Sequence, residues 1–127
     1  MLENTKGFSG FSVNDLQKAK NFYQGTLGLK VKEGEMGLLE IYINEDTRVI
    51  AYPKPNHEPA TFTILNFPVP DLEKAVDQLI AKGITMEQYH FGQIDTDKKG
   101  IAHGKPEIAW FKDPAGNIIS LIGENGM

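Results

Sequence analysis

The pattern of apolar and polar residues in the first half of the chain is repeated in the second half. Phe11 and Val13 alternate with small or polar residues, and Phe67 and Val69 repeat that alternation in the second half. Residues 11–19 and 67–75 also share an aspartate, a leucine, a lysine and an alanine at matching places. Such alternation predicts a β-strand at each position. We therefore predict an internal repeat with one strand at the start of each half.

A helix is predicted directly after each of these strands. Asp15 and Asp71 precede apolar residues that recur with helical spacing. Their carboxylates are placed to accept hydrogen bonds from the free N–H groups of a first helical turn. Gly28 and Gly83 follow the apolar residues, as expected for a left-handed residue at the end of a helix.

Three further β-like segments follow each glycine. We expect them at about residues 29–33, 38–43 and 48–52, and again at about 84–89, 107–111 and 117–122. Each half then has the order βαβββ. The proline-rich residues 53–60 link the halves. An insertion near residues 90–106 makes the second half longer, and we interpret it as a lid or rim.

Composition narrows the class of protein. A chain of 127 residues is enough for one domain, which we place at residues 1–127. Its formal net charge of -4 argues against a nucleic-acid partner, and the absence of cysteine excludes thiolate metal sites. No apolar run approaches the ~18 residues of a membrane span, and the amino terminus does not resemble a signal peptide. We therefore expect a cytoplasmic protein with no membrane partner.

Three motifs resemble those of a known group of proteins. F-x-V-x-D-L precedes the first helix at residues 11–16, L-G-L follows it at 27–29, and W-F-K-D-P-A-G-N lies at 110–117. In this order they resemble the vicinal oxygen chelate superfamily, the group of glyoxalase I, extradiol dioxygenases and bleomycin-resistance proteins. The resemblance implies an α+β fold in which two tandem βαβββ modules form a cup-shaped mixed sheet around a cleft, with the helices on the outside. The modules would span residues 7–53 and 61–123, and the protein would form a homodimer.

The same resemblance implies four positions for metal ligands. They carry Phe8, Ala51, Ile64 and Ser120, whereas metal-using members have His, Gln or Glu there. A divalent ion needs several anionic or imidazole ligands. We therefore expect no cofactor. The alternative is a lyase, isomerase or dioxygenase that binds a divalent metal such as Zn, Ni, Mn or Fe through other residues.

Other ionisable side chains offer candidate chemistry. His57, His90 and His103 lie in predicted loops, where we interpret them as solvated. Together with nearby carboxylates they are the residues from which a displaced metal site would be built. Glu40 and Glu107 recur in register as candidate acid–base carboxylates, although most strand glutamates face solvent. No nucleophile motif is present, so no catalytic residue is assigned.

Without a metal, the predicted cleft suits an organic ligand. Alternation along the strands gives a wall that is mostly apolar with a few hydrogen-bonding groups. We predict ligand contacts from Phe8, Ser12, Tyr42, Ala51, Tyr52, Ile64, Asn66, His103, Trp110 and Ser120. The aromatic side chains and the acidic charge balance favour an aromatic or cationic molecule. Ordinary core packing is the other interpretation of Trp110 and the tyrosines, and it needs no ligand.

Asn66 carries the most information among these positions. An amide within an apolar strand is costly to bury unless it is paired, so Asn66 meets either a ligand or neighbouring backbone. We therefore predict a small-molecule-binding protein of the glyoxalase/bleomycin-resistance type. A dimeric interaction module, with the cleft filled by its own side chains, is a further alternative.

Overall fold

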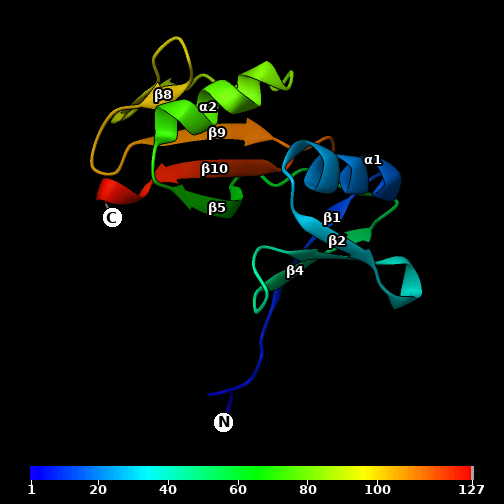
Figure 1. Ribbon diagram of the computed structural model, residues 1–127. Coiled ribbons are helices and arrows are strands. Elements are labelled where there is room, and N and C mark those ends of the chain that lie inside the picture. Colours follow the sequence, from blue (N-terminus) through cyan, green and yellow to red (C-terminus); the bar gives the residue numbers. More distant parts are fainter. Residues whose placement is uncertain (127) are drawn as a thin grey trace. The chain divides into compact units, whose positions relative to one another are not determined.

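A computed structural model describes residues 1–126, which divide into two compact units. Unit 1 comprises residues 1–59, and unit 2 begins at Ala60. Each unit contains one βαβββ module and is described by itself (Figure 1). Within residues 1–126, no helix is both long and apolar enough to cross a membrane.

Unit 1 is a four-stranded sheet with a helical segment. Its elements are β1 (Ser9–Val13), α1 (Leu16–Lys20), a π-helical turn η1 (Asn21–Thr26), β2 (Lys30–Glu33), a 3-10 turn η2 (Glu35–Gly37), β3 (Leu39–Tyr42) and β4 (Arg48–Pro53). The strand order is β1-β4-β3-β2, with β1 parallel to β4 and the other neighbours antiparallel. This is the sheet of a single βαβββ module.

Unit 2 repeats this topology with an added hairpin. Its elements are β5 (Thr63–Val69), α2 (Leu72–Ala81), β6 (His90–Phe91), β7 (Ile94–Asp95), β8 (Ile101–Ala102), β9 (Ile108–Lys112), β10 (Ile118–Gly123) and a 3-10 turn η3 (Glu124–Gly126). The main sheet has the order β5-β10-β9-β8, and β5 is parallel to β10. Strands β6 and β7 form a separate hairpin.

Each helical segment begins after the predicted aspartate and ends before the predicted glycine, although in unit 1 the segment continues from α1 into the π-helical turn η1. Asp15 and Asp71 each accept a hydrogen bond from the backbone N–H three residues later, at 3.0 Å and 3.1 Å. Gly28 and Gly83 follow the helical segments with φ of +73° and +90°, a conformation that costs other residues steric strain. The predicted α+β class and the two βαβββ modules are confirmed.

Each sheet buries the face that its helix covers. In unit 1 the buried side chains on this side of the sheet are those of Phe11, Val13, Ala19, Phe22, Tyr23, Val31, Leu39, Ile41, Val49 and Ala51, and Ile50 is buried on the opposite face. In unit 2 they include those of Leu72, Val76, Leu79, Ile101, Ala109, Phe111, Ile119 and Leu121. Helix α2 runs beside β9 and β10 (Figure 1). The opposite face of each sheet, which carries no helix, is called its helix-free face.

One predicted strand is wrong. Residues 84–89 form no strand, and Ile101–Ala102 of the insertion pairs with β9 instead. Only one backbone hydrogen bond joins the earlier segment to β9, from Glu87 N–H to the Trp110 carbonyl at 2.9 Å. The insertion returns tightly against this segment at Gly100, where a Cβ atom would lie 2.7 Å from Met86 Cβ. A long insertion thus displaces a local strand preference.

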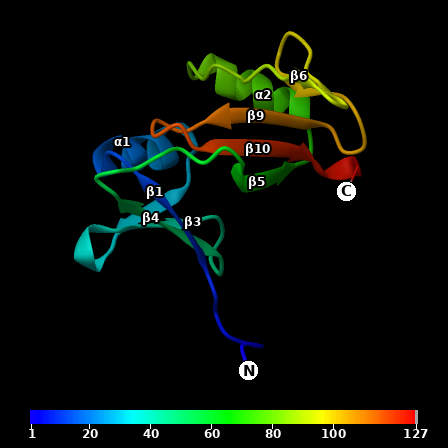
Figure 2. The same cartoon turned by 180° about the vertical axis from the view of Figure 1, so that it is seen from behind.

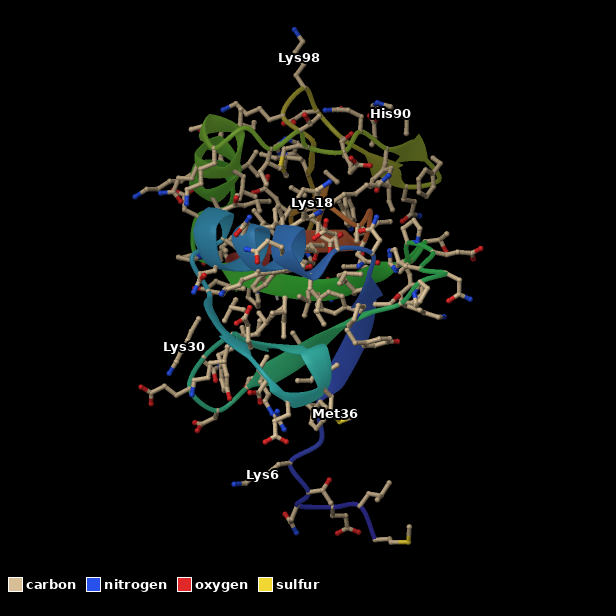
Figure 3. All side chains as sticks on the ribbon, turned by 90° about the vertical axis from the view of Figure 1, so that its right-hand side faces the viewer. Lys6, Lys18, Lys30, Met36, His90 and Lys98 are labelled. Atoms are coloured by element: carbon tan, nitrogen blue, oxygen red, sulfur yellow. The ribbon has the colours of Figure 1, made fainter. Side chains whose placement is uncertain are left out.

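The insertion is anchored to its own unit. Lys99 lies 3.0 Å from Glu73 and 2.9 Å from Asp77, both on α2. The segment is the yellow region that lies beside α2 and β9 (Figure 2). Lys98, next to the anchoring lysine, points outward from the loop tip (Figure 3). Whether this segment acts as a lid stays a prediction, as do the single domain and the predicted cleft.

Candidate functional site

The strand register of unit 1 sorts the predicted ligand contacts by face. Ser12 lies beside Tyr52, and Phe11 lies beside Ala51, in the parallel pairing of β1 with β4. Side chains directly beside each other in a sheet share a face. Ser12 and Tyr52 therefore lie on the helix-free face. The prediction that Ala51 joins them is wrong: neighbours along a strand point to opposite faces, and Ala51 is fully buried on the helix side.

The other side chains on the helix-free face of unit 1 contact one another. The Arg48 guanidinium forms an ion pair with Glu40 and lies 4.4 Å from the centre of the Phe8 ring. The ring of Tyr42 is accompanied by the ammonium groups of Lys30 and Lys32, at 5.7 Å and 5.5 Å. Cation–π contacts of this kind stabilise the rings in place. Phe8, Arg48, Glu40 and Tyr42 therefore have partners on this face, whereas Tyr52 is 38% exposed.

Ser12 also has a partner from the linker. Its hydroxyl lies 2.7 Å from Nδ1 of His57, whose backbone N–H donates to the Lys54 carbonyl. Lys54 in turn donates its N–H to the Val13 carbonyl. His57 is half-buried, so its interpretation as a solvated loop residue is wrong. The turn that follows β4 places this ring against β1.

Unit 2 brings three predicted contacts into one row. Ser120 on β10 lies between Asn66 on β5 and Trp110 on β9, and all three are direct cross-strand neighbours. They share the helix-free face, because the intervening residues are the buried ones that pack under α2. Ile64 sits at a β-bulge and has no direct partner on β10.

The Ser120 hydroxyl orients the Asn66 amide. It donates a hydrogen bond to Asn66 Oδ1 at 2.5 Å, and Ser120 itself is only 1% exposed. The amide NH2 of Asn66 is turned the other way, and no acceptor within residues 1–126 receives its hydrogens. Asn66 is exposed. The amide therefore presents two hydrogen-bond donors on one side of Ser120, and the indole of Trp110 lies on the other side.

His103 does not join this row. Its Nε2 lies 2.7 Å from Asp97 and its Nδ1 lies 2.5 Å from Glu107. Both carboxylates accept hydrogen bonds only, so both contacts require a doubly protonated ring. The hydrogen bonds that His103 donates to Asp97 and then to Glu107 raise the pKa of His103. A hydrogen bond from the backbone N–H of Ile101 is the main cause that lowers the pKa of Asp97.

This histidine lines a polar groove of about 800 Å³ in unit 2. The walls include the first turn of α2 and the loop before β9, and the side chains of Asp71, Glu73, His103, Lys105, Glu107 and Asn125 lie in them. Glu73 and Glu107 already have partners in Lys99 and His103. The groove is thus bounded by charges that are largely paired.

A family model matches residues 8–121 of the chain. Its description is the Glyoxalase/Bleomycin resistance protein/Dioxygenase superfamily. The chain belongs to this superfamily. A comparison with curated protein sequences finds no match.

Solved structures of similar fold include members of the glyoxalase/bleomycin-resistance superfamily. TnmS3, an antibiotic-binding protein from Streptomyces sp. CB03234, is 23% identical, with 94% of this chain and 97% of that chain covered and a TM-score of 0.65. The fosfomycin resistance protein FosX from Listeria monocytogenes is 14% identical, with 97% and 94% covered and a TM-score of 0.70. A glyoxalase family protein from Enterococcus faecalis is 19% identical, with 96% and 99% covered and a TM-score of 0.67. At these identities the likeness shows the fold alone.

The superfamily's metal-ligand positions do not fit a metal in this member. Phe8, Ile64 and Ala51 offer no donor atom, and the Ser120 hydroxyl is already bonded to Asn66. Within residues 1–126, no group of three or more His, Asp and Glu side chains is arranged to hold an ion. His57, His90 and His103 bond to Ser12, Asp95 and the Asp97–Glu107 pair respectively.

Sequence reasoning missed part of the surroundings of Trp110. Tyr89 packs edge-on against the indole, with ring centres 5.4 Å apart and planes inclined at 72°. Burial, more than the negative charge of the Glu87 carboxylate, raises the pKa of Tyr89. A strand prediction over residues 84–89 gave no sign of this contact. Only the fold of the insertion, which brings Thr96 to Tyr89, shows it.

Proposed function

We propose that this superfamily member binds a small, partly aromatic organic molecule without a metal, on the helix-free face of unit 2. The observation that carries this proposal is the row Asn66–Ser120–Trp110. It combines an indole surface with two oriented amide donors, which is the pairing of apolar area and few polar groups typical of ligand sites.

The replacement of the metal ligands supports binding without an ion. A serine hydroxyl stands at the position where metal-using members have a glutamate, and it positions an amide instead. The donor that this creates suits a carbonyl, ether or hydroxyl oxygen on the ligand. The antibiotic-binding description of TnmS3 is consistent with this kind of function, although it says nothing of the ligand here.

Unit 1 contributes less to this proposal. Phe8, Tyr42 and Ser12 each have a partner on or beside their own sheet. Displacing those partners would oppose the binding of a ligand there. His103 is likewise engaged by two carboxylates. We therefore place the principal contacts at Asn66 and Trp110, with Ser120 as a positioning residue.

The test uses ligand released from the protein. Protein purified without metal affinity steps or chelators is denatured, and released organic compounds are identified by mass spectrometry and titrated back by calorimetry. We expect Asn66→Leu to weaken binding about tenfold, the equivalent of one lost hydrogen bond, and Ser120→Ala about threefold. Asn44→Leu, an asparagine change in a turn of unit 1, is the control and should leave affinity unchanged.

Two results would contradict the proposal. The first is unchanged affinity of Asn66→Leu and Trp110→Leu, both shown to be folded by thermal unfolding. The second is binding that occurs only when a divalent metal is added. If no compound copurifies, the same variants are titrated with a panel of aromatic compounds.

A further inference from the structure

The insertion of unit 2 adds two rings to Trp110. Tyr89 stands edge-on to the indole, and Phe91 on β6 stands edge-on to Tyr89, with ring centres 5.8 Å apart and planes at 66°. Two neighbouring rings that are nearly perpendicular enclose a corner. One wall of the corner is the face of one ring, and the other wall is the edge of the next ring. The side chain of Phe91 remains 63% exposed to solvent. Phe91 is the last of these three rings, and contact with a ligand would remove more of its apolar surface from water.

Tyr89 is held in place by its backbone and by the neighbouring indole. Its backbone N–H donates to Thr96 Oγ1 at 2.9 Å, and its carbonyl accepts the Thr96 N–H at 3.0 Å. Its ring packs edge-on against Trp110, with ring centres 5.4 Å apart. Because the ring is fixed before any ligand arrives, binding would lose little side-chain entropy. The aromatic series is therefore preorganised.

A corner between two perpendicular rings discriminates by shape. A flat ring can stack on one wall and meet the edge of the other, and both contacts are favourable for aromatic quadrupoles. A saturated ring of similar size is thicker, because hydrogens project from both of its faces, and it lacks the quadrupole. We propose that Tyr89 and Phe91 are specificity-determining residues that make the Trp110 site select flat, fused-ring aromatic ligands. This inference rests on the proposed function and names its ligand class.

The test uses a matched pair of probes. Naphthalene has two fused aromatic rings, and tetralin has nearly the same size with one ring saturated; neither has a charge or a hydrogen-bonding group. Trp110 is the only tryptophan of the chain, so its indole Nε1–H gives a single NMR signal that reports binding at the site. We expect naphthalene to bind about tenfold more tightly than tetralin.

Substitutions separate the contributions of the two rings. Phe91→Leu should reduce this ratio to about threefold, and Tyr89→Leu to about one, because Tyr89 joins Phe91 to the indole. Tyr89→Phe keeps the ring and should keep most of the ratio, which guards against a folding defect. Ile80→Ala removes an exposed apolar side chain from α2 and should change nothing.

Each other outcome overturns the inference. If both probes shift the indole signal but the ratio ignores Tyr89 and Phe91, the inference fails while the proposed function stands. If neither probe shifts the signal, both fail. If Phe91→Leu changes only the sedimentation behaviour of the protein, Phe91 covers a second copy of the chain and the inference also fails.

Discussion

The two βαβββ units share a topology and differ in what their helix-free faces do. In unit 1 the side chains on that face are engaged with one another, as in the Arg48–Glu40 ion pair and the contact of Arg48 with Phe8. In unit 2 the matching face carries a hydroxyl that orients an amide on one neighbouring strand and has an indole on the other neighbouring strand. The repeated fold therefore determines the face on which each side chain lies, whereas the residues present in each unit determine what it contacts.

The units also differ in how their last hairpin is held. The turn before β10 in unit 2 is organised by Asp113, which is 5% exposed and accepts hydrogen bonds from Ala115 N–H and Asn117 N–H, each at 2.9 Å. The turn before β4 in unit 1 has one exposed counterpart, from Asp46 N–H to Asn44 at 2.9 Å. Burial makes the first turn far more sensitive to substitution.

The largest expected effect follows from this difference between the turns. Asp113→Ala should lower the free energy of unfolding by about 4 kcal/mol, because several buried donors lose a charged acceptor. Asn44→Ala should lower it by about 0.5 kcal/mol. Urea unfolding of both variants measures the two losses of stability. Equal losses would contradict the difference proposed between the two turns.

A second contrast concerns two glycines with positive φ. A Cβ added at Gly100 would meet Met86 Cβ at 2.7 Å and the Glu87 carbonyl at 2.9 Å, whereas one added at Gly28 would meet nothing within 4 Å. Gly100→Ala should therefore cost about 2 kcal/mol and Gly28→Ala about 1 kcal/mol. Denaturation midpoints provide the measurement. A smaller effect at Gly100 would mean that the insertion is not pressed against residues 86–87.

The helix caps should show no contrast. Asp15 and Asp71 make the same hydrogen bond at nearly the same distance, so replacing either by Ala should lower stability by about 1 kcal/mol. Asp→Asn variants, which keep an acceptor oxygen, serve as controls and should lose less. A difference between Asp15→Ala and Asp71→Ala well above 1 kcal/mol would show that the two helices are not equivalent.

The smallest effect is a pH dependence specific to unit 2. The pKa of His103 is raised in the folded state, so its contribution is complete below the ordinary histidine value of about 6.5 and is lost as pH rises through the folded pKa. The lowered pKa of Asp97 adds stability that is present above about pH 4 and is lost at lower pH.

The stability difference between wild type and His103→Asn should therefore be largest between about pH 4 and 6.5. Because these groups are well exposed, the effect will be small. Thermal unfolding across this range measures it. A difference that grows as pH rises above neutrality would contradict the assigned sign.

Much of the fold could be predicted because its signals are local. Strand alternation at Phe11 and Phe67, the caps Asp15 and Asp71, and the terminal glycines depend on neighbours in the chain, and all match the structure. The absence of a strand over residues 84–89 could not be predicted from the local pattern. The strand that pairs with β9 is Ile101–Ala102, which lies more than ten residues farther along the chain.

The candidate site divides in the same way. Alternation from the superfamily's ligand positions correctly put Ser12, Asn66 and Ser120 on helix-free faces. It failed at Ala51, because Tyr52 occupies the helix-free face and successive residues cannot share one. The hydrogen bond between His57 and Ser12 could not be predicted, because the two residues are 45 positions apart in the sequence. Cytoplasmic location and homodimer formation stay predictions.

Binding of an organic molecule by unit 2 without a metal can be tested on a single preparation. Protein purified without chelators or metal affinity steps is divided between elemental analysis and native mass spectrometry. We expect no stoichiometric divalent metal and a retained organic mass that disappears in Trp110→Leu. Near-stoichiometric metal in the wild type, or an organic mass that Trp110→Leu keeps unchanged, would contradict it.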